Sequence, residues 1–238
     1  MANIDSSSVS VMRTSDNTVV KTITTGASPT EIAIAPDGTK VYVLNEGSRN
    51  VSIIQASDDT VVKTLAVGKM PIAIAVTPNG KKVYVANRGG GTVSVIKALD
   101  DTVVTAIPVG ELPTAIAISP DGEKAYVMNE GSKNVSVVKI LDDTVVATVS
   151  VSQKPSAIAI ACDGAKVYVA LRGSGMVSVI ETSGNTTTTV MVGEGPRAIA
   201  VSHGVCVKIS SENLGELLEK FSQSLGELTK AVQRVGVV

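Results

Sequence analysis

The sequence contains no tryptophan and only one phenylalanine, and aromatic residues make up just 2% of its 238 residues. Hydrophobic residues nevertheless reach 44%, so the core must be built from Val, Ile and Ala. Side chains branched at Cβ favour strands. The scarcity of aromatic rings also argues against a surface that binds sugars or bases by stacking. An all-β protein with a small-residue core is therefore expected.

The chain has no excess of charge of either sign. Its 21 Lys and Arg nearly balance its 22 Asp and Glu, and the formal net charge is -1. Because phosphate backbones and anionic lipid surfaces attract basic patches, we expect no nucleic-acid partner. No stretch approaches the ~18 apolar residues of a membrane-spanning helix. Residues 1–8 are short and polar and lack the features of a secretory signal, so the sequence as written predicts a cytoplasmic protein, although a signal could have been removed.

Cysteine and histidine are almost absent. Cys162 and Cys206 do not occupy equivalent positions, since one lies in a turn and one in a strand, and they are expected to be unpaired thiols. A bridge between them would need Cα atoms within ~7 Å. His203, the only histidine, cannot by itself build a zinc site or a catalytic triad. The sequence therefore predicts no catalytic residues, no metal site and no cofactor.

What the chain does contain is a repeat. All four tyrosines, at 42, 84, 126 and 168, stand 42 residues apart. The repeated units cover residues 9–50, 51–92, 93–134 and 135–176, followed by a shorter copy at 177–210. In the second unit, strand-length apolar segments lie at 51–54, 60–67, 72–77 and 82–87. Asp, Asn and Gly between them are typical of hairpin turns. Four short antiparallel strands per unit are the size of one propeller blade.

The recurring Pro-Asp-Gly turn, followed by KVYVLN, KVYVAN, KAYVMN or KVYVAL, resembles the YVTN β-propeller repeat of surface-layer and YncE-like proteins. The resemblance covers residues 9 to about 209 and implies a propeller fold. Members of that family commonly have seven blades, and seven such units would need more residues than this chain has. The resemblance also permits a lyase or quinoprotein-like enzyme, and members are often extracellular or periplasmic.

The phase of the repeat suggests how a smaller ring could close. If each blade runs from its inner strand outward, the chain begins with third and outer strands at 9–24 and ends with an inner strand at 197–202 and a second strand at 205–210. These halves complete each other. We therefore expect residues 1–210 to form a five-bladed propeller of four-stranded antiparallel blades, closed by pairing of the terminal strands. The alternative is an open fragment that dimerises or awaits further blades.

Residues 211–238 differ in composition and are expected to form an amphipathic α-helix that begins at Ser211 and ends at Gly236. Apolar residues follow a heptad spacing. They are Leu214, Leu218, Phe221, Leu225, Leu228, Val232 and Val235. This seam must be covered either by the propeller itself or by the same helix of another chain in a coiled coil. Gly215 and Gly226 each cost roughly 1 kcal/mol of helix propensity. Both alternatives remain open.

Several recurring polar residues have structural explanations. The residues before glycine in the Pro-Asp-Gly turns, Asp37, Asn79, Asp121 and Asp163, suit a turn better than a calcium site. Asn45, Asn87 and Asn129 close the YVxN strand and are expected to cap it or bond to loop backbone. The tyrosines are expected to pack between blades with the hydroxyl near a polar end.

The loops that vary between units offer the candidate site. After the YVxN strand the second loop residue alternates in charge, and the segments that enter the inner strand also vary. The resulting candidates are Glu46, Arg88, Glu130, Arg172, Glu31 and Arg197, with Glu31 taken as the counterpart of Ile72, Thr114, Ser156 and Arg197. On one end of the propeller they would form a charged surface for a protein partner or a small ligand. The competing explanation is a set of ion pairs between blades, each worth under ~1 kcal/mol.

The sequence favours a non-enzymatic propeller that acts as a rigid binding or scaffold module, with homo-oligomers formed through the helical tail as an open alternative. Function by fold analogy alone is a weak argument. A second hypothesis is the lyase or quinoprotein-like enzyme. A third is a repeat-amplified or engineered protein with no ligand, which the near-identity of the units would fit.

Overall fold

The computed structural model describes residues 1–152 and 154–201. The chain divides into two compact units, Met1–Ser202 and His203–Val238, and the described residues belong to the first. Several predictions lie outside them: the inner-strand residue 202, His203, Cys206, the second strand at 205–210 and the helix at 211–238 with its apolar seam. Within the described part of the chain, no helix is long and apolar enough to cross a membrane.

The described residues form five antiparallel sheets, and four of these have four strands each. The first sheet has β1 (Ala2–Asn3), β2 (Ser8–Arg13) and β3 (Thr18–Thr24). The second has β4 (Pro29–Ile34), β5 (Lys40–Asn45), β6 (Asn50–Gln55) and β7 (Thr60–Ala66). The third has β8 (Pro71–Val76), β9 (Lys82–Asn87), β10 (Thr92–Lys97) and β11 (Thr102–Pro108). The fourth has β12 (Pro113–Ile118), β13 (Lys124–Asn129), β14 (Asn134–Lys139) and β15 (Thr144–Ser150), and the fifth β16 (Pro155–Ile160), β17 (Lys166–Leu171), β18 (Met176–Glu181) and β19 (Thr186–Met191).

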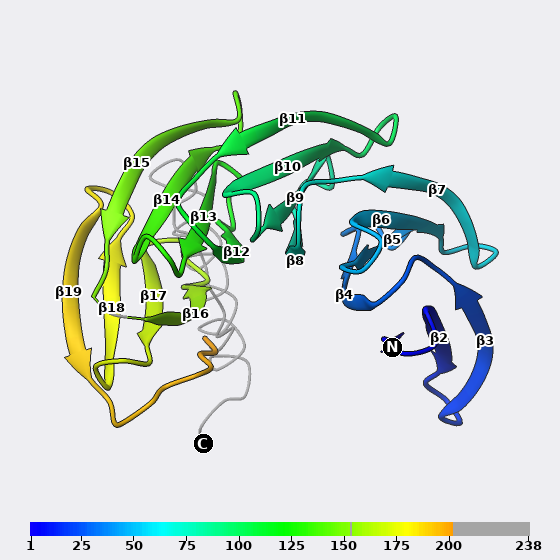
Figure 1. Ribbon diagram of the computed structural model, residues 1–238, viewed down its shortest axis with the longest axis horizontal. Coiled ribbons are helices and arrows are strands. Elements are labelled where there is room, and N and C mark those ends of the chain that lie inside the picture. The colour runs from blue at the N-terminus through cyan, green and yellow to red at the C-terminus, as the bar shows by residue number, and fades with distance from the viewer. Residues whose placement is uncertain (153, 202–238) are drawn as a thin grey trace, which may run out of the picture. The chain divides into compact units, whose positions relative to one another are not determined.

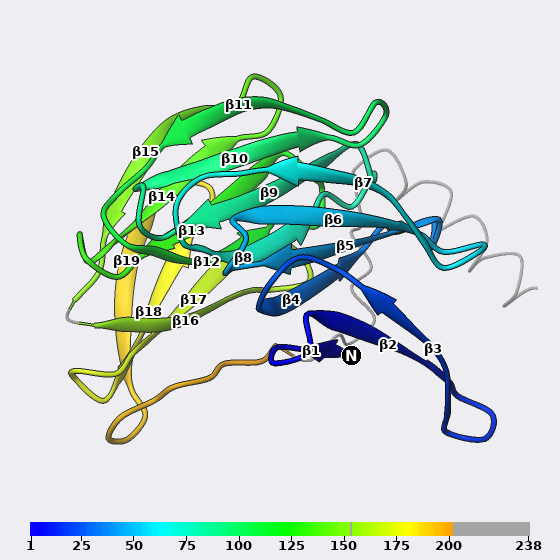
Figure 2. The same cartoon turned by 45° about the vertical axis from the view of Figure 1, so that its right-hand side comes forward.

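Successive sheets follow one another along an arc, with the first strand of each four-stranded sheet on the inside and the last on the outside (Figure 1). The inner strands β4, β8, β12 and β16 contact one another in that order. Figure 2 shows the strands of each sheet running side by side in the same succession. The predicted blade and its strand order are therefore confirmed.

The hairpin turns have the chemistry expected of them. The carboxylate of Asp37 accepts hydrogen bonds from the backbone N–H of Thr39 at 3.0 Å and from its hydroxyl at 2.8 Å. Asn79 accepts in the same way from the N–H of Lys81 at 3.0 Å. Gly38, the residue after Asp37, has a φ of 71°, a conformation that glycine adopts without steric cost. The turn explanation for the Asp-Gly positions is confirmed.

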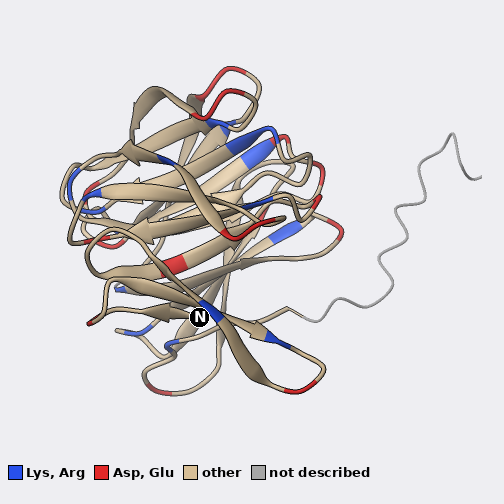
Figure 3. Cartoon of the chain, turned by 90° about the vertical axis from the view of Figure 1, so that its right-hand side faces the viewer, with Lys and Arg blue, Asp and Glu red and all other residues tan. Residues whose placement is uncertain are grey.

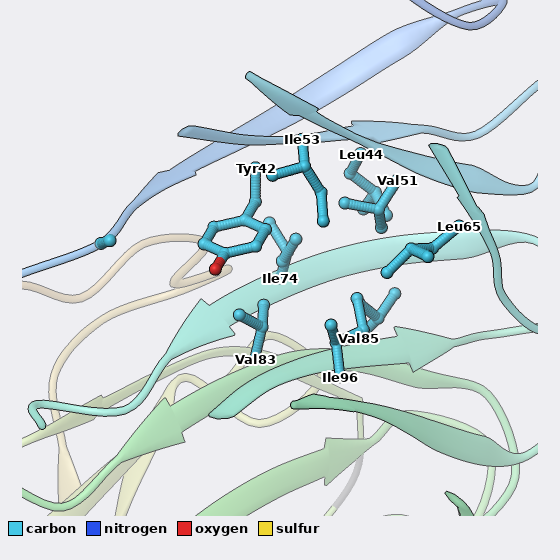
Figure 4. Packing of buried hydrophobic residues seen from close by; sticks show 10 residues of the cluster. Tyr42, Leu44, Val51, Ile53, Leu65, Ile74, Val83, Val85 and Ile96 are labelled. Atoms are coloured by element: carbon cyan, nitrogen blue, oxygen red, sulfur yellow. The ribbon is translucent and has the colours of Figure 1, made fainter. Parts of the chain in front are cut away.

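The core lies between neighbouring sheets. Tyr42, Leu44, Val51 and Ile53 of β5 and β6 face Ile74, Val83, Val85 and Ile96 of the next sheet (Figure 4). Tyr42 is fully buried, as predicted for a ring that packs between blades. Burying one large aliphatic side chain contributes about 1.5–3 kcal/mol. Each interface thus supplies a small hydrophobic core of its own, which is why the fold needs several adjacent units.

The first sheet shows where the predicted closure differs from the structure. Ala2 pairs with Val9 and Asn3 with Ser8, the same register in which Asn45 pairs with Asn50 in the second sheet. Asn3 therefore occupies the place of Asn45, at the end of a second strand. The sequence analysis described residues 1–8 only as short and polar and predicted no strand there, although Met-Ala-Asn resembles the Val-Ala-Asn that ends β9.

The predicted inner strand at 197–202 is wrong for residues 197–201, which form no strand. The first sheet contains only β1, β2 and β3. Pairing between the N-terminal and C-terminal strands is therefore not seen in the described part of the chain, and the ring closure expected from the sequence is not shown.

Candidate functional site

The candidate residues on the YVxN loops do not form a continuous ring of ion pairs. Arg88 Nη2 lies 3.3 Å from Glu130 Oε2, with side chains 37% and 41% exposed. This pair joins the third and fourth sheets. Neither Glu46 nor Arg172 takes part in an ion pair among the described residues. An exposed pair of this kind contributes less than about 1 kcal/mol, so Arg88 and Glu130 alone fit the ion-pair explanation.

The strand register places Glu31 at a different position of the repeat from the one assumed in the sequence analysis. It pairs with Leu44 in register, whereas the equivalent places in the next three inner strands are taken by Ala73, Ala115 and Ala157. The counterpart of Ile72 is therefore Thr30. Glu31 is the one carboxylate at a position that is otherwise alanine in these strands.

Glu31 links two inner strands. Its Oε2 accepts a hydrogen bond of 2.7 Å from the backbone N–H of Ile74 in β8. Burial raises the pKa of the Glu31 carboxyl above its usual value, and the bond from Ile74 offsets part of this rise. Arg197, the last candidate, is exposed in the segment that follows β19. Among the described residues, Arg88 and Glu130 are thus the only two predicted site residues that form an ion pair with each other.

A repeated cluster at the opposite ends of the strands escaped the sequence analysis. Lys40 Nζ lies 2.8 Å from both carboxylate oxygens of Asp101 in the next sheet. Lys82 Nζ lies 2.7 Å from Asp143 Oδ2 in the sheet after that. Both contacts join residues 61 positions apart, and this common spacing was the available signal. Figure 3 shows the acidic segments concentrated in turns between strands.

Lys40 and Lys82 also donate to backbone carbonyls, those of Ala98 and Ile140, and in the fourth sheet only this carbonyl contact remains. Lys124 Nζ donates to the carbonyl oxygen of Thr182 at 3.1 Å, and Asn185 stands where Asp101 and Asp143 stand in earlier units. All three residues have left-handed backbone conformations, with φ of 54° for Asp101, 58° for Asp143 and 54° for Asn185. We call the contact of this lysine with the next sheet the inter-sheet fastening. It recurs three times, and in the third case the lysine has no carboxylate partner.

The tyrosine hydroxyls differ between these clusters. Tyr84 donates to Asp143 Oδ1 at 2.5 Å, as expected for a hydroxyl at a polar end. The hydroxyls of Tyr42 and Tyr126 are buried without a hydrogen-bond partner in the structure. Burial, with a further contribution from Asp101, raises the pKa of Tyr42 to about 12. The same residue type at equivalent positions is thus satisfied in one interface and unsatisfied in two.

Two cavities of about 600 Å³ lie beside these clusters. The first groove, between the second and third sheets, includes Lys40, Tyr42, Lys81, Lys97 and Leu99. The second groove, between the third and fourth sheets, includes Lys81, Lys82, Lys124, Lys139 and Leu141. Most of these residues are repeat equivalents. Volumes of this size are within the usual range of small-molecule sites.

The asparagines that close the YVxN strands are structural, but their partners are side chains of the third strand rather than loop backbone. Asn45 Nδ2 donates to Asn50 Oδ1 at 2.8 Å and to Ser52 Oγ at 2.9 Å. Asn87 and Asn129 make the same pair of bonds one and two units later. A ligand role for them is not needed to explain their recurrence.

The prediction of unpaired thiols is wrong for Cys162, which is disulfide-bonded. It is half-buried in the turn between β16 and β17, and its place in a turn gave no sequence signal for a bridge. Among the described residues, no group of three or more His, Cys, Asp or Glu is placed to hold a metal ion.

Comparisons with known proteins place this geometry among propellers. Residues 58–148 match a family described as Lactonase, 7-bladed beta-propeller, a match to less than half of the chain. The structure is similar to Kuenenia stuttgartiensis hydrazine synthase, with a TM-score of 0.63 and 29% identity over 68% of this chain and 49% of that chain. No curated protein matches the sequence.

Two further solved structures show the same fold. A functionally unknown protein from Desulfotomaculum acetoxidans has a TM-score of 0.65 and 21% identity over 76% of this chain and 61% of that chain. Dihydro-heme d1 dehydrogenase NirN has a TM-score of 0.71 and 17% identity over 81% of this chain and 43% of that chain. The chain is a β-propeller repeat protein. It matches less than two thirds of the length of each of these three proteins.

Proposed function

We propose that this propeller is a rigid, non-enzymatic binding or scaffold module that presents variable loops. The observation that carries the proposal is the repeated fastening of successive sheets by Lys40, Lys82 and Lys124. The lysine contact to the next sheet recurs in three successive units, whereas Glu46 and Arg88 differ in charge at equivalent loop positions. A fixed framework with variable loops is how many scaffolds bind their partners.

The test exchanges the charges of one pair without removing it. The double variant Arg88→Glu, Glu130→Arg retains an ion pair between the third and fourth sheets but reverses the charge pattern of the loops. If these loops bind a partner, the double variant melts like the unmodified chain and no longer captures the partner in a pull-down. Unchanged capture would exclude these two residues from recognition.

A second candidate is enzymatic, and the match of residues 58–148 to a lactonase family favours it. The resemblance to YVTN and YncE-like repeats also permits a lyase or quinoprotein-like activity. Glu31 is a half-buried carboxylate on an inner strand, so it is the group to test as a proton acceptor. Lactone hydrolysis that is lost in Glu31→Gln, while the variant stays folded, would support the enzyme. No turnover above the buffer rate on a lactone panel would support the binding module.

Two further proposals concern closure of the ring and assembly of chains through the tail. Ser156 Oγ donates to the carbonyl oxygen of Pro196 at 2.7 Å, which supports a course of the segment after β19 beside the inner strand β16. We propose that residues 197–210 continue from there to complete the propeller and that residues 211–238 mediate homo-oligomer formation. Deleting 211–238 and measuring the solution mass tests the second point, since an unchanged mass would contradict it.

A further inference from the structure

We propose that the first groove, between the second and third sheets, binds a small amphipathic anion, an aliphatic chain that ends in a carboxylate or a phosphate. This site lies at the ends of the strands that carry the Pro-Asp-Gly turns, away from the variable loops of the proposed function. It is therefore independent of that function.

The groups without partners in the first groove are hydrogen-bond donors. The Tyr42 side chain is 0% exposed, lines the groove and has a hydroxyl with no hydrogen-bond partner in the structure. Lys81 takes part in no ion pair among the described residues. A buried donor without a partner destabilises the fold. Because the Tyr42 hydroxyl has almost no accessible surface, a ligand must displace the side chains that cover it in order to bring it an acceptor atom.

The acidic groups nearby are already occupied. Asp101 places both oxygens 2.8 Å from Lys40, and Asp100 lies 2.9 Å from Lys97. The carboxylate of Asp37 accepts two hydrogen bonds from Thr39. These interactions leave the Lys81 ammonium and the Tyr42 hydroxyl for an incoming group. An anionic head complements both.

The rim of the groove supplies the apolar half of the site. Leu99 is 85% exposed and Leu141, its counterpart at the second groove, is 81% exposed. In the units on either side the same position is held by Ser57 and Ser183. An exposed leucine therefore occurs at both cavities of about 600 Å³. An aliphatic chain that covers Leu99 would be stabilised there by the burial of apolar surface.

The second groove provides an internal control. There Asp143 divides its oxygens between Lys82 and the hydroxyl of Tyr84, so the tyrosine has no free donor. In the first groove Lys40 contacts both oxygens of Asp101, and the Tyr42 hydroxyl has no hydrogen-bond acceptor. The proposal therefore predicts opposite behaviour for the two tyrosines.

The experiment measures binding of octanoate and octyl phosphate to the full chain by calorimetry, with octyl glucoside as the uncharged probe of the same length. Each probe is used below its micellar concentration. We expect at least one anion to bind and the glucoside to bind at least tenfold more weakly. Octanoate and octyl phosphate distinguish a carboxylate head from a phosphate head. Binding of neither anion, or equal binding of the glucoside, would overturn the proposal.

Variants assign the site to the first groove. Tyr42→Phe and Lys81→Met should each weaken anion binding about tenfold, the effect of losing one hydrogen bond or charge contact. Tyr84→Phe and Lys69→Met, an exposed lysine at the other strand ends, should leave binding unchanged. Tyr84→Phe should lower the melting temperature, and Tyr42→Phe should not. If Tyr42→Phe destabilises the fold as much as Tyr84→Phe does, Tyr42 bonds to Asp101 in solution and the proposal fails.

Discussion

At the scale of single residues, a glycine lies directly against the buried asparagine of the same sheet in the second, third and fourth sheets. A Cβ placed on Gly68 would lie 2.5 Å from Cγ of Asn87 and 2.6 Å from its Nδ2. Gly26 and Gly110 meet Asn45 and Asn129 in the same way. In the fourth unit both partners change together, to Ser152 and Leu171. The absence of a side chain at the glycine is therefore what admits the buried asparagine.

The first prediction follows from this contact. Gly68→Ala should destabilise the propeller by about 1–3 kcal/mol, because the new methyl group overlaps Asn87 and must displace it. Urea unfolding measures the loss. Gly184→Ala is the matched control, since its Cβ would meet nothing closer than Thr186 Cγ2 at 3.8 Å. A similar loss in both variants would mean that the Asn87 contact is not the cause.

The second prediction concerns the uncharged member of the inter-sheet fastening. Asn185→Asp gives Lys124 and Tyr126 the carboxylate that Lys82 and Tyr84 have in Asp143. The backbone already suits aspartate, as Asp143 has nearly the same φ. We expect a gain of about 1 kcal/mol in unfolding free energy at neutral pH. In the double variant Lys124→Met, Asn185→Asp the gain should shrink, and a gain that persists there would contradict the mechanism.

At the scale of the strands, the contact of Glu31 in β4 with β8 is expected to depend on pH. Glu31 of β4 accepts from Ile74 of β8, and burial raises its pKa above 4.5. A carboxyl whose pKa is higher in the folded than in the unfolded chain binds its proton more tightly when folded. Its contribution is therefore complete below the unfolded pKa and is lost as the pH rises through the folded pKa.

The third prediction uses this sign. Compared with Glu31→Gln, the unmodified chain should be relatively more stable at about pH 4 and should lose that advantage as the pH rises toward 7. Unfolding free energies of the two proteins at several pH values measure the difference. The glutamine retains an acceptor for Ile74, so the hydrogen bond itself is preserved. A difference that is constant with pH would show that the pKa of Glu31 is the same in the folded and the unfolded chain.

The strands themselves were predictable because each has its own apolar run and turn residues. The contacts between sheets were not, since Lys40 and Asp101 lie 61 residues apart and on different blades. Glu31 was aligned with the wrong residue because the inner-strand segment varies next to proline. β1 was missed because only Ala2 and Asn3 form it. Local patterns thus gave the elements, whereas the site depended on distances between units.

At the scale of the whole described unit, the repeat has two ends with uncovered edges. Met12 of β2 is 45% exposed, whereas its counterpart Ile54 in β6 is 2% exposed. Ile54 packs in one cluster with Val9 and Ile23 of the first sheet, whereas among the described residues no sheet precedes the first one to pack on the corresponding face of β2. The outer strands β3, β7, β11 and β15 each have one buried residue, whereas β19 has none. In a repeat array each unit is stabilised by its neighbours, so stability should fall toward any end that no further segment completes.

The last prediction tests this gradient by amide hydrogen exchange. The second strands β5, β9 and β13 are largely buried. Their amides should exchange slowest, through opening of the whole array. Amides of β19, and of β2 and β3 once residues 197–210 are deleted, should exchange faster, through local opening of the terminal sheets. If the ring closes as proposed, the first sheet of the unmodified chain is protected as strongly as the third. Repeating the measurement after deletion of residues 197–210 then shows whether this segment completes the first sheet, because protection of β2 would be lost only in that case.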